Sequence, residues 1–411
     1  MGMVALLGYS REQIRAAVCD MYSQVARAPT SGFHFPVGRQ IAEALGYPPA
    51  RLQGLPEATL RAFAGVGYPF RAEAVRPGDT VLDIGAGAGN DSLIAAGLVG
   101  SAGRVIALDL TPAMTATLYH AAQAGGCDNV AVVQGSAERL PLSDGSVDVV
   151  TSNGALNLVP DKRRAVAEMF RVLRPGGRLQ MADVVIRRPV TVDCGEDPRL
   201  WVECVVGATV DEELLHLFRE AGFEAVEVLR RHDYFAHSPS AQTREIAESF
   251  GAHSLDLGMR RAATAPSTLQ RWLWRADPRH WLAALRRRGF LGVAALLLAL
   301  LSCYGTLAAL ALLPLLGYSL AVDEGAWAVA IAAFALLTLA AVAAGVRRHG
   351  RWAVVALAAT GVSVILYALF IQYSLVVELA GFLLLAGGVV LDAWLRRRHQ
   401  ARVLGLEAAP R

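Results

Sequence analysis

The chain has 411 residues and a formal net charge of +3, with 54% hydrophobic and 18% charged residues. This length indicates more than one domain. The small net charge, without a basic run interleaved with aromatic residues, argues against a nucleic-acid partner. The five cysteines are odd in number and form no Cys-x-x-Cys pair, so we expect neither a disulfide framework nor a zinc site. Charges and glycines are interleaved up to about Arg261, whereas Leu, Ala and Val dominate after Phe290.

The first 75 residues are predicted to form a helical lid. Ser10 can cap a helix, and Gln13 three residues later completes a capping box. The helix then carries an apolar stripe formed by Ile14, Val18, Met21 and Val25. The stretch from Pro29 to Pro69 is rich in Gly and Pro, which indicates loops around short helices.

Residues 76–262 alternate between strand-like and helical segments. The predicted strands are Thr80–Ile84, Arg104–Asp109, Val130–Gln134, Val147–Ser152, Arg178–Asp183, Glu224–Leu229 and Ser254–Met259. A turn over Arg174–Gly177 precedes the fifth strand, and Asp211–Gly222 is predicted to be a helix. Such alternation indicates an α/β fold, in which a parallel sheet carries helices on both faces.

Val81 to Asp91 has the pattern of a strand, a glycine turn and a helix start. The turn places three glycines at alternate positions: Gly85, Gly87 and Gly89. Glycine lets the backbone adopt φ > 0 and approach a ligand closely. Asp109 ends the next strand, where a carboxylate can accept hydrogen bonds from ribose hydroxyls. Further polar residues fall at strand ends, where parallel sheets bind ligands: Asp83, Ser136, Glu138, Asn153 and Asp183. The pattern predicts a nucleoside-cofactor site.

The glycine spacing departs from the dinucleotide fingerprint G-x-G-x-x-G, because Asn90 holds the sixth position. The G-x-G-x-G run with Asp83 before it resembles motif I of S-adenosylmethionine (SAM)-dependent methyltransferases. SAM is a sulfonium cation without a pyrophosphate, so an acid near the loop suits the ammonium of its methionine part. The resemblance implies SAM as the cofactor and a Rossmann-like sheet.

Residues from about 8 to 262 resemble the arsenite methyltransferase group of these enzymes. Besides motif I, the matching stretches are FAGVGYP (63–69), DLTPAM (109–114), SNGALNLVPDK (152–162) and WVECVVGA (201–208). The resemblance implies that the cofactor loop is lined by Asp83, Gly85, Gly87 and Gly89. It also implies that Asp109 binds the ribose and Met114 covers the adenine. Ala137 and Glu138 then lie at the adenine edge, and Asn153 faces the methionine portion.

The resemblance also implies a thiolate site, because enzymes of this group hold trivalent arsenic, which is thiophilic, on cysteines from separate motifs. The corresponding positions here carry Val66, Ser92 and Gly154, and only Cys204 remains of the pattern. The candidate catalytic residues are Cys204, Asn153 and Cys19, and the candidate ligands of a metal or metalloid are Cys204 and Cys194. An arsenite substrate requires at least two of Cys19, Cys194 and Cys204 to converge near Asn153. We expect Cys127 to be a small buried hydrophobe.

Residues 290–398 contain four apolar stretches: Leu291–Leu312, Ala326–Val346, Ala353–Ile371 and Leu375–Leu395. Each is close to the roughly 20 residues that span a hydrocarbon core. We therefore predict an all-α domain of four transmembrane helices, followed by a tail over 399–411. Arginine clusters precede the first helix, separate the second from the third and follow the fourth. The positive-inside rule places both chain ends in the cytoplasm, and the N-terminus lacks a secretory signal pattern. We expect a multi-pass protein of the cytoplasmic (inner) membrane.

Residues 263–289 are predicted to form an amphipathic interfacial linker, because they carry Trp272, Trp274 and Trp281 among leucines. A plain linker is the alternative. The run Ser302–Gly305 and two further stretches between about Arg287 and His399 loosely resemble MerC-type mercury-transport membrane proteins. That family uses a cysteine pair in its first span. Here Cys303 holds the first position of the pair, and Thr306 holds the second.

Three functional hypotheses follow. The first is a membrane-tethered SAM-dependent methyltransferase that acts on a small molecule or a metalloid. The second keeps the enzyme but gives it a hydrophobic acceptor, such as a lipid or a quinone. The third is a mercury or metalloid transporter with a modifying domain. The lipid bilayer is the expected partner, and no residue pattern predicts an oligomeric state.

Overall fold

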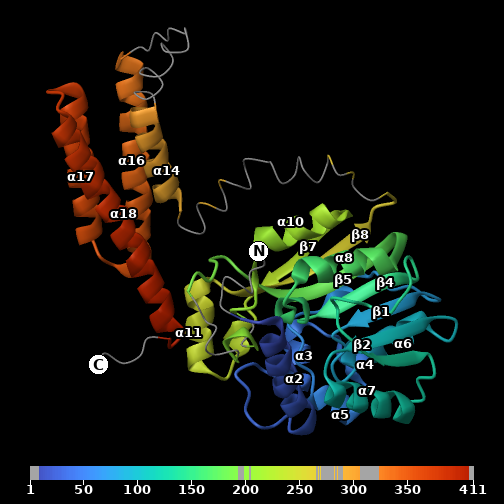
Figure 1. Cartoon of the computed structure of the whole chain (residues 1–411). Helices are drawn as coiled ribbons and strands as arrows, with labels where there is room; N and C mark the ends of the chain where they lie inside the picture. The colour runs from blue at the N-terminus through green and yellow to red at the C-terminus, as the bar shows by residue number, and fades with distance from the viewer. Residues whose placement is uncertain are drawn as a thin grey trace. The chain divides into compact units, whose positions relative to one another are not determined.

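The computed structural model describes residues 9–192, 199–202, 205–264, 290–305 and 324–406, with four single positions between 265 and 289. The chain divides into two compact units, Met1–Arg275 and Ala276–Arg411. The first unit is built around a mixed β-sheet, and the second consists of apolar helices (Figure 1).

The sheet of the first unit has the strand order β3-β2-β1-β4-β5-β8-β7, with β6 paired to β5. The strands are β1 (Thr80–Ile84), β2 (Arg104–Asp109), β3 (Val130–Gln134), β4 (Val147–Asn153), β5 (Leu173–Ile186), β6 (Thr209–Val210), β7 (Phe223–His232) and β8 (His253–Arg261). The first five strands pair in parallel, and β7 and β8 are antiparallel additions. The prediction of an α/β sheet is confirmed.

Helices pack against the sheet through two buried clusters (Figure 1). One joins the central strands to α8 (Lys162–Val172) and α10 (Asp211–Ala221), and the other joins β2 to α6 (Asn90–Val99) and α7 (Pro112–Ala124). The helices cover the apolar middle of the strands. The polar residues of these strands lie at their carboxyl ends, where the site forms.

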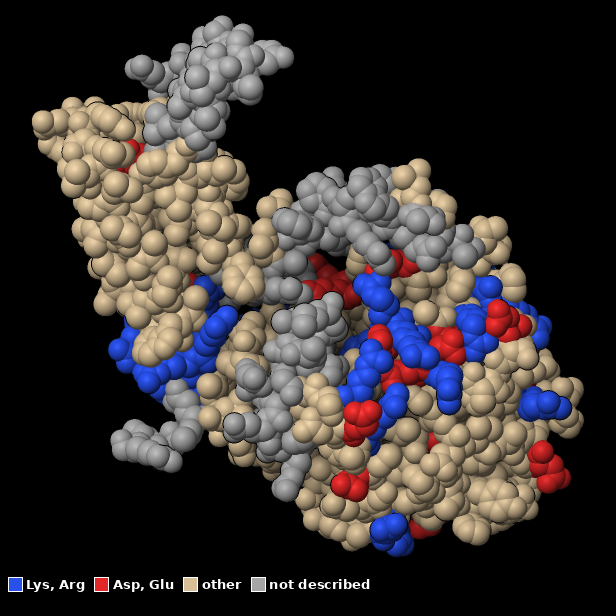
Figure 2. Space-filling view, viewed as in Figure 1, with Lys and Arg blue, Asp and Glu red and all other residues tan. Residues whose placement is uncertain are grey.

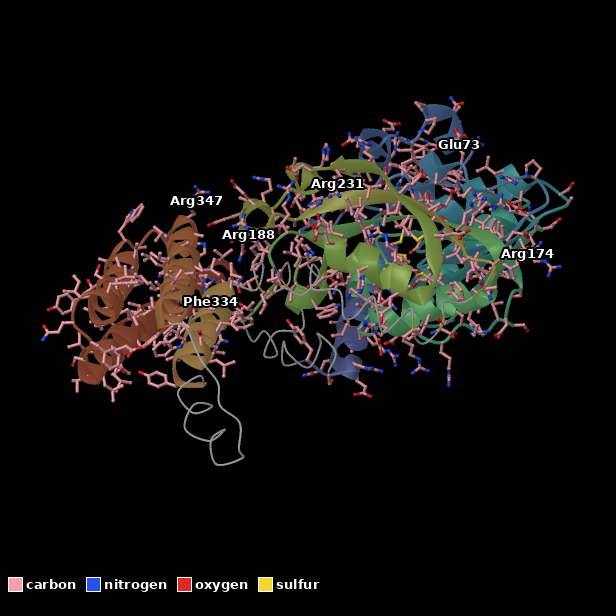
Figure 3. All side chains as sticks on the ribbon, turned by 90° about the horizontal axis from the view of Figure 1, so that it is seen from above. Glu73, Arg174, Arg188, Arg231, Phe334 and Arg347 are labelled. Atoms are coloured by element: carbon pink, nitrogen blue, oxygen red, sulfur yellow. The ribbon has the colours of Figure 1, made fainter. Side chains whose placement is uncertain are left out.

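The fifth strand is longer than predicted. Its ladder with β4 passes from the pair Val147–Leu173 directly to the pair Val149–Arg178. Residues 174–177 are therefore looped out as a bulge, in which Gly176 has φ of 74°. The predicted turn exists, but it lies inside β5 instead of preceding it. Arg174 projects outward from this bulge (Figure 3) and pairs with Asp148 at 2.6 Å.

The N-terminal region forms short helices that lie over the carboxyl ends of the strands. They are α2 (Arg11–Arg27), α3 (Arg39–Leu45), α4 (Pro49–Leu52), α5 (Glu57–Arg61) and the 3₁₀ turn η1 (Pro69–Ala72). The predicted capping box of α2 is present, since Ser10 and Gln13 each accept a hydrogen bond from the other's backbone N–H. Ile14, Val18 and Val25 of the stripe are buried, whereas Met21 is half-buried.

Smaller elements complete the first unit. They are η2 (Leu156–Leu158), α9 (Arg199–Val202), η3 (Phe235–His237) and α11 (Ala241–Phe250). Trp201 of α9 is fully buried, and its indole N–H donates to Leu158 O at 3.0 Å. This contact fastens α9 to the loop that follows β4.

The second unit contains α14 (Leu291–Leu300), the π-helical turn η4 (Leu301–Gly305), α16 (Glu324–His349), α17 (Ala353–Phe370) and α18 (Leu375–Val403). Within the described residues three helices are long and apolar enough to cross a membrane: Gly325–Arg347, Ala353–Phe370 and Leu375–Val403. The first predicted span begins as α14 and η4, but its residues 306–312 lie outside the described residues. Most of the predicted interfacial linker also lies outside them.

Close glycine contacts join the helices of the second unit. A Cβ at Gly361 of α17 would lie 2.6 Å from the backbone nitrogen of Leu385, so the backbones of α17 and α18 touch. At one end of the bundle, Asp392 is buried between His349 at 3.0 Å and Arg396 at 2.6 Å. Basic side chains gather at one end of this unit (Figure 2), and Arg347 extends outward from α16 (Figure 3).

Candidate cofactor and active site

The glycine turn after β1 folds back against the neighbouring strand. The backbone N–H groups of Gly85 and Ala86 both donate to Leu108 O, at 2.8 and 3.0 Å. Gly85, Gly87 and Gly89 have φ of 73°, 54° and 99°, values that residues other than glycine rarely adopt. A Cβ at Gly85 would collide with Ala155, so the turn can lie against the loop after β4 only because it lacks side chains there.

Asp109 is held in place by its own strand end and the glycine turn. Its carboxylate accepts hydrogen bonds from the backbone N–H groups of Gly87 at 2.9 Å and Thr111 at 2.7 Å. Burial raises the pKa of the Asp109 carboxyl, and the bonds from Thr111 and Gly87 oppose that rise. The carboxylate is therefore fixed and able to accept further donors.

Two more buried acids flank the glycine turn in the sequence. Asp91, the second residue of α6, accepts hydrogen bonds from Tyr47 Oη at 2.5 Å and Asn153 Nδ2 at 3.0 Å. Asp83 accepts one from Ser92 Oγ at 2.5 Å. Burial, and then the charge of Asp91, raise the pKa of Asp83 to about 8. Two neighbouring carboxylates that disfavour each other's ionisation form a site suited to a cation.

Asn153 connects this acid pair to the N-terminal region. Its Oδ1 accepts from the backbone N–H of Val66 at 2.8 Å and of Gly67 at 3.2 Å. Its Nδ2 donates to Asp91, to Tyr47 Oη at 3.0 Å and to Gly67 O at 3.1 Å. One amide at the end of β4 thus fixes a strand end, an acid and the segment around Val66.

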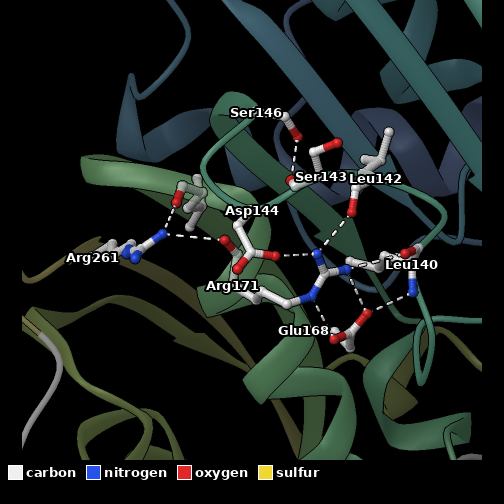
Figure 4. Close-up of polar contacts among 9 residues, drawn as sticks. Leu140, Leu142, Ser143, Asp144, Ser146, Glu168, Arg171 and Arg261 are labelled. Carbon is white, nitrogen blue, oxygen red and sulfur yellow. Dashed lines mark hydrogen bonds and ion pairs between the residues drawn. The ribbon is translucent and has the colours of Figure 1, made fainter.

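Another part of the cavity wall is formed by the loop after β3. Glu138 is buried, accepts from the Asp161 backbone N–H at 3.0 Å and forms an ion pair with Arg15 of α2. The loop continues to residue 146 and is anchored by Arg171, which donates to Leu140 O, Leu142 O, Asp144 and Glu168 (Figure 4). Arg171 therefore connects α8 to the loop that carries Ala137 and Glu138.

These groups line one cavity that is open to solvent. Of the predicted cofactor residues, its wall includes Asp83, Gly85, Gly87, Asp109, Met114, Ala137, Glu138 and Asn153. Gly89 does not line it but caps α6. Asn90 lines it, and its buried Oδ1 accepts no hydrogen bond from the protein. An unsatisfied acceptor beside two carboxylates fits the ammonium group of SAM, and Asp109 at the end of β2 fits its ribose.

Comparison with known proteins agrees with this geometry. Residues 76–222 match the family model described as a methyltransferase domain, and residues 290–394 match that of the MerC mercury resistance protein. Over 164 residues the chain is 43% identical to an arsenite methyltransferase of Halobacterium salinarum, an overlap of 40% of this chain and 42% of that relative. Residues 76–222 form a SAM-dependent methyltransferase domain.

Two further examples are similar to parts of the chain. Over 113 residues the chain is 43% identical to the ubiquinone/menaquinone biosynthesis C-methyltransferase UbiE of Marinomonas, covering 27% of this chain and 45% of that protein. The crystal structure of an arsenic(III) SAM methyltransferase from Chlamydomonas reinhardtii is 32% identical, with a TM-score of 0.43, and the match covers 55% of this chain and 74% of that one. The chain thus spans less than half the length of the two curated relatives.

The cysteines are placed unevenly around the methyltransferase domain. Cys19 of α2 lies 4.0 Å from Leu110 O, beside the Asp109 end of the cavity and not among the partners of Asn153. Cys194 and Cys204 lie outside the described residues, so their convergence stays a prediction. Cys127 is half-buried against the cluster of α6 and α7, less buried than predicted. Within the described residues, no group of three or more His, Cys, Asp and Glu could hold a metal ion.

Three residues of the site were missed by the sequence analysis. Asn90 and Asp91 follow the glycine turn directly, and their polarity at a buried helix start was an available signal. Tyr47 carries no such signal, because it reaches Asp91 from a short connection between α3 and α4.

The positions that the resemblance assigns to thiolates carry other residues. A Cβ at Gly154 would lie 3.1 Å from Val66 Cγ1, and Ser92 is bonded to Asp83.

Proposed function

We propose that the chain is a membrane-tethered methyltransferase that uses SAM and is similar to arsenite methyltransferases. One observation carries the proposal: a single cavity is lined by three buried acids, Asp109 at the end of β2 and the pair Asp83 and Asp91 on either side of the glycine turn. This arrangement suits a molecule with a ribose in its middle and an ammonium at its end.

Each acid then has a distinct role. Asp109 accepts the ribose hydroxyls, while Asp83, Asp91 and Asn90 accept the ammonium. When bound, SAM supplies a methyl group on a sulfonium, which is already a good leaving group. The residues of the chain need only bind, orient and exclude water, so positioning by groups such as Asn153 provides most of the rate.

Calorimetric titration of the full chain with SAM tests the cofactor assignment. We expect one site per chain, and we expect Asp109→Ala to weaken it strongly. Arg104→Ala is a matched control, because Arg104 is exposed at the opposite end of β2. Equal SAM affinity in Asp109→Ala and Arg104→Ala would argue against the assignment.

The first candidate acceptor is a trivalent metalloid held on thiolates, which the similarity to an arsenite methyltransferase supports. It is tested by an assay with SAM, arsenite and a thiol, comparing the wild type with Cys204→Ser and Cys127→Ser. Loss of methylated arsenic in Cys204→Ser alone supports the metalloid. Absence of product from the wild type excludes it.

The second candidate acceptor is an apolar molecule such as a quinone precursor or a lipid. The cavity wall contributed by the N-terminal region supports it, because it contains Val18, Tyr22 and Phe63. The similarity to a quinone-biosynthesis C-methyltransferase points the same way. In assays with phenolic quinone precursors, we expect Tyr22→Ala to raise the acceptor KM while leaving SAM affinity unchanged.

We further infer that the second unit inserts into the cytoplasmic membrane, with both chain ends in the cytoplasm. Three candidate spans and arginines near one end of α16 and α18 support this topology. Reporter fusions at residues 350 and 411 are expected to be cytoplasmic and a fusion at 372 external. Uptake of mercury into vesicles, abolished by Cys303→Ser, would instead favour the transporter hypothesis over a simple anchor.

A further inference from the structure

A second recess adjoins the cofactor cavity and is lined by three arginines. Its wall consists of Arg15, Gln134, Gly135, Ser136, Glu138, Arg139, Pro141 and Arg164. Arg15, Gly135, Ser136 and Glu138 also line the cofactor cavity. The two spaces therefore share a wall at the loop after β3, and their guanidinium groups come from α2, from that loop and from the first turn of α8.

The acids around this recess are already neutralised by other partners. Glu138 forms an ion pair with Arg15, and Asp161 pairs with Arg11 at 2.8 Å. Glu168 on α8, whose carboxylate feels the charge of Arg164, is held by Arg171 at 2.8 Å. The recess is therefore left with a positive excess that no acid in its wall balances.

That excess resides on Arg139 and Arg164. Both side chains are exposed, and neither forms an ion pair with any residue that the structure describes. The Nε of Arg15 is buried and makes no hydrogen bond, although the same guanidinium pairs with Glu138. Guanidinium groups that line one recess with free donors are suited to bidentate binding of phosphate oxygens.

We infer that this recess binds a phosphate-bearing anion next to the cofactor. The inference goes beyond the proposed function, because it needs neither SAM nor a methyl acceptor. Two sources share this chemistry: a free phosphate monoester or inorganic phosphate, and the phosphodiester headgroup of an acidic lipid.

The test is calorimetric titration of the full chain, in zwitterionic detergent and without SAM, with inorganic phosphate and with glycerophosphoglycerol. The first probe represents free phosphate and the second a lipid headgroup without its tails, so the tighter ligand identifies the source. We expect Arg139→Ala and Arg164→Ala to weaken binding by about tenfold each, since each removes a charge-assisted hydrogen bond. Arg139→Lys should retain part of the affinity, because it keeps the charge but not the bidentate geometry.

Arg104→Ala is the control, because it removes an exposed arginine from the opposite end of the sheet. Equal weakening by Arg104→Ala and Arg164→Ala would show general electrostatic attraction and overturn the inference. Unchanged affinity in the double variant Arg139→Ala, Arg164→Ala would also overturn it. A SAM titration on the same samples keeps the two proposals separate, because neither arginine replaced in the double variant lines the cofactor cavity.

Discussion

The cofactor cavity has two acidic sites, which we call the ribose end (Asp109) and the ammonium end (Asp83 and Asp91), and they are held in different ways. At the ribose end, Asp109 is fixed by backbone donors from Gly87 and Thr111, which belong to the glycine turn and to its own strand end. At the ammonium end, Asp91 is fixed by side chains of Tyr47 and Asn153, which are 44 and 62 residues distant in sequence. The first end depends on local backbone geometry, and the second depends on the N-terminal region packing over the sheet.

The difference has an electrostatic consequence. Backbone N–H groups donate to the Asp109 carboxylate, whereas side chains donate to Asp83 and Asp91. Burial raises the pKa of all three acids, and the charge of Asp91 raises the pKa of Asp83 further. A bound ammonium is expected to favour the ionised forms of Asp83 and Asp91.

The largest expected effect is at the ribose end. Asp109→Ala removes up to two charge-assisted hydrogen bonds to the ribose, at about 1.5–3 kcal/mol each. SAM affinity measured by calorimetry should therefore fall by roughly 10- to 10⁴-fold. Asp109→Asn should lose less, because an amide can still accept from a hydroxyl. A change of less than threefold in Asp109→Ala would show that the ribose lies elsewhere.

A smaller effect is expected from Asp91→Asn. This change removes one of two carboxylates but keeps a polar group that can contact Tyr47 and Asn153, so we expect a loss of about 1.5–3 kcal/mol in SAM binding. The remaining acid should ionise more easily, because its neighbour no longer carries charge. The pH dependence of SAM binding should therefore move to lower pH in this variant, and an unmoved profile would contradict coupling between the two acids.

The pH dependence of the wild type tests the ammonium end directly. Burial and the charge of Asp91 raise the pKa of Asp83 to about 8, and a bound ammonium favours the ionised carboxylate. SAM affinity should therefore rise by up to about tenfold per pH unit between pH 6 and 8. Ser92→Ala removes a hydrogen bond that lowers this pKa, so the midpoint should move to higher pH. A profile that is flat between pH 6 and 8 would show that Asp83 stays ionised without a ligand.

Asp83 is expected to make the stability of the fold fall as the pH rises, whereas SAM affinity rises with pH. The folded-state pKa of Asp83 lies above its ordinary value, so the folded chain binds more protons than the unfolded chain between about pH 4 and 8. The contribution of Asp83 to stability is complete below pH 4 and is lost as the pH rises through 8. A bound cation should remove this loss, so stabilisation by SAM should increase with pH.

The sequence could predict the parts of the site that depend on local contacts, but not those that depend on contacts between distant segments. The first four strands were predicted to within one residue, because their apolar runs end in polar residues at the sheet edge. Asp109 and the glycine turn could be assigned a role because their contacts are local. Tyr47 could not, because nothing in its neighbourhood indicates a partner across the cavity. The fifth strand was predicted too short, because its Pro-Gly-Gly bulge resembles a turn that starts a strand.

The membrane part shows the same limit. Length and apolar composition predict spanning helices, and three such helices are present among the described residues. Length and composition do not predict which faces of the helices pack against one another. The contact of Gly361 with the backbone of α18 and the burial of Asp392 between His349 and Arg396 depend on how the helices pack.

The smallest expected effect separates the two ends most sharply. Tyr47→Phe keeps the ring that packs against Phe63 and Tyr68 but removes the hydroxyl that donates to Asp91. Asp91 retains Asn153 and Asn90 as donors, so SAM affinity should fall only about fivefold to tenfold, less than the about 1.5–3 kcal/mol of a hydrogen bond to a charged group. The loss should be greater for SAM and S-adenosylhomocysteine, which both carry the ammonium, than for 5′-methylthioadenosine, which lacks it. Equal losses for all three ligands would place the effect in the packing of the N-terminal region and not at the ammonium end.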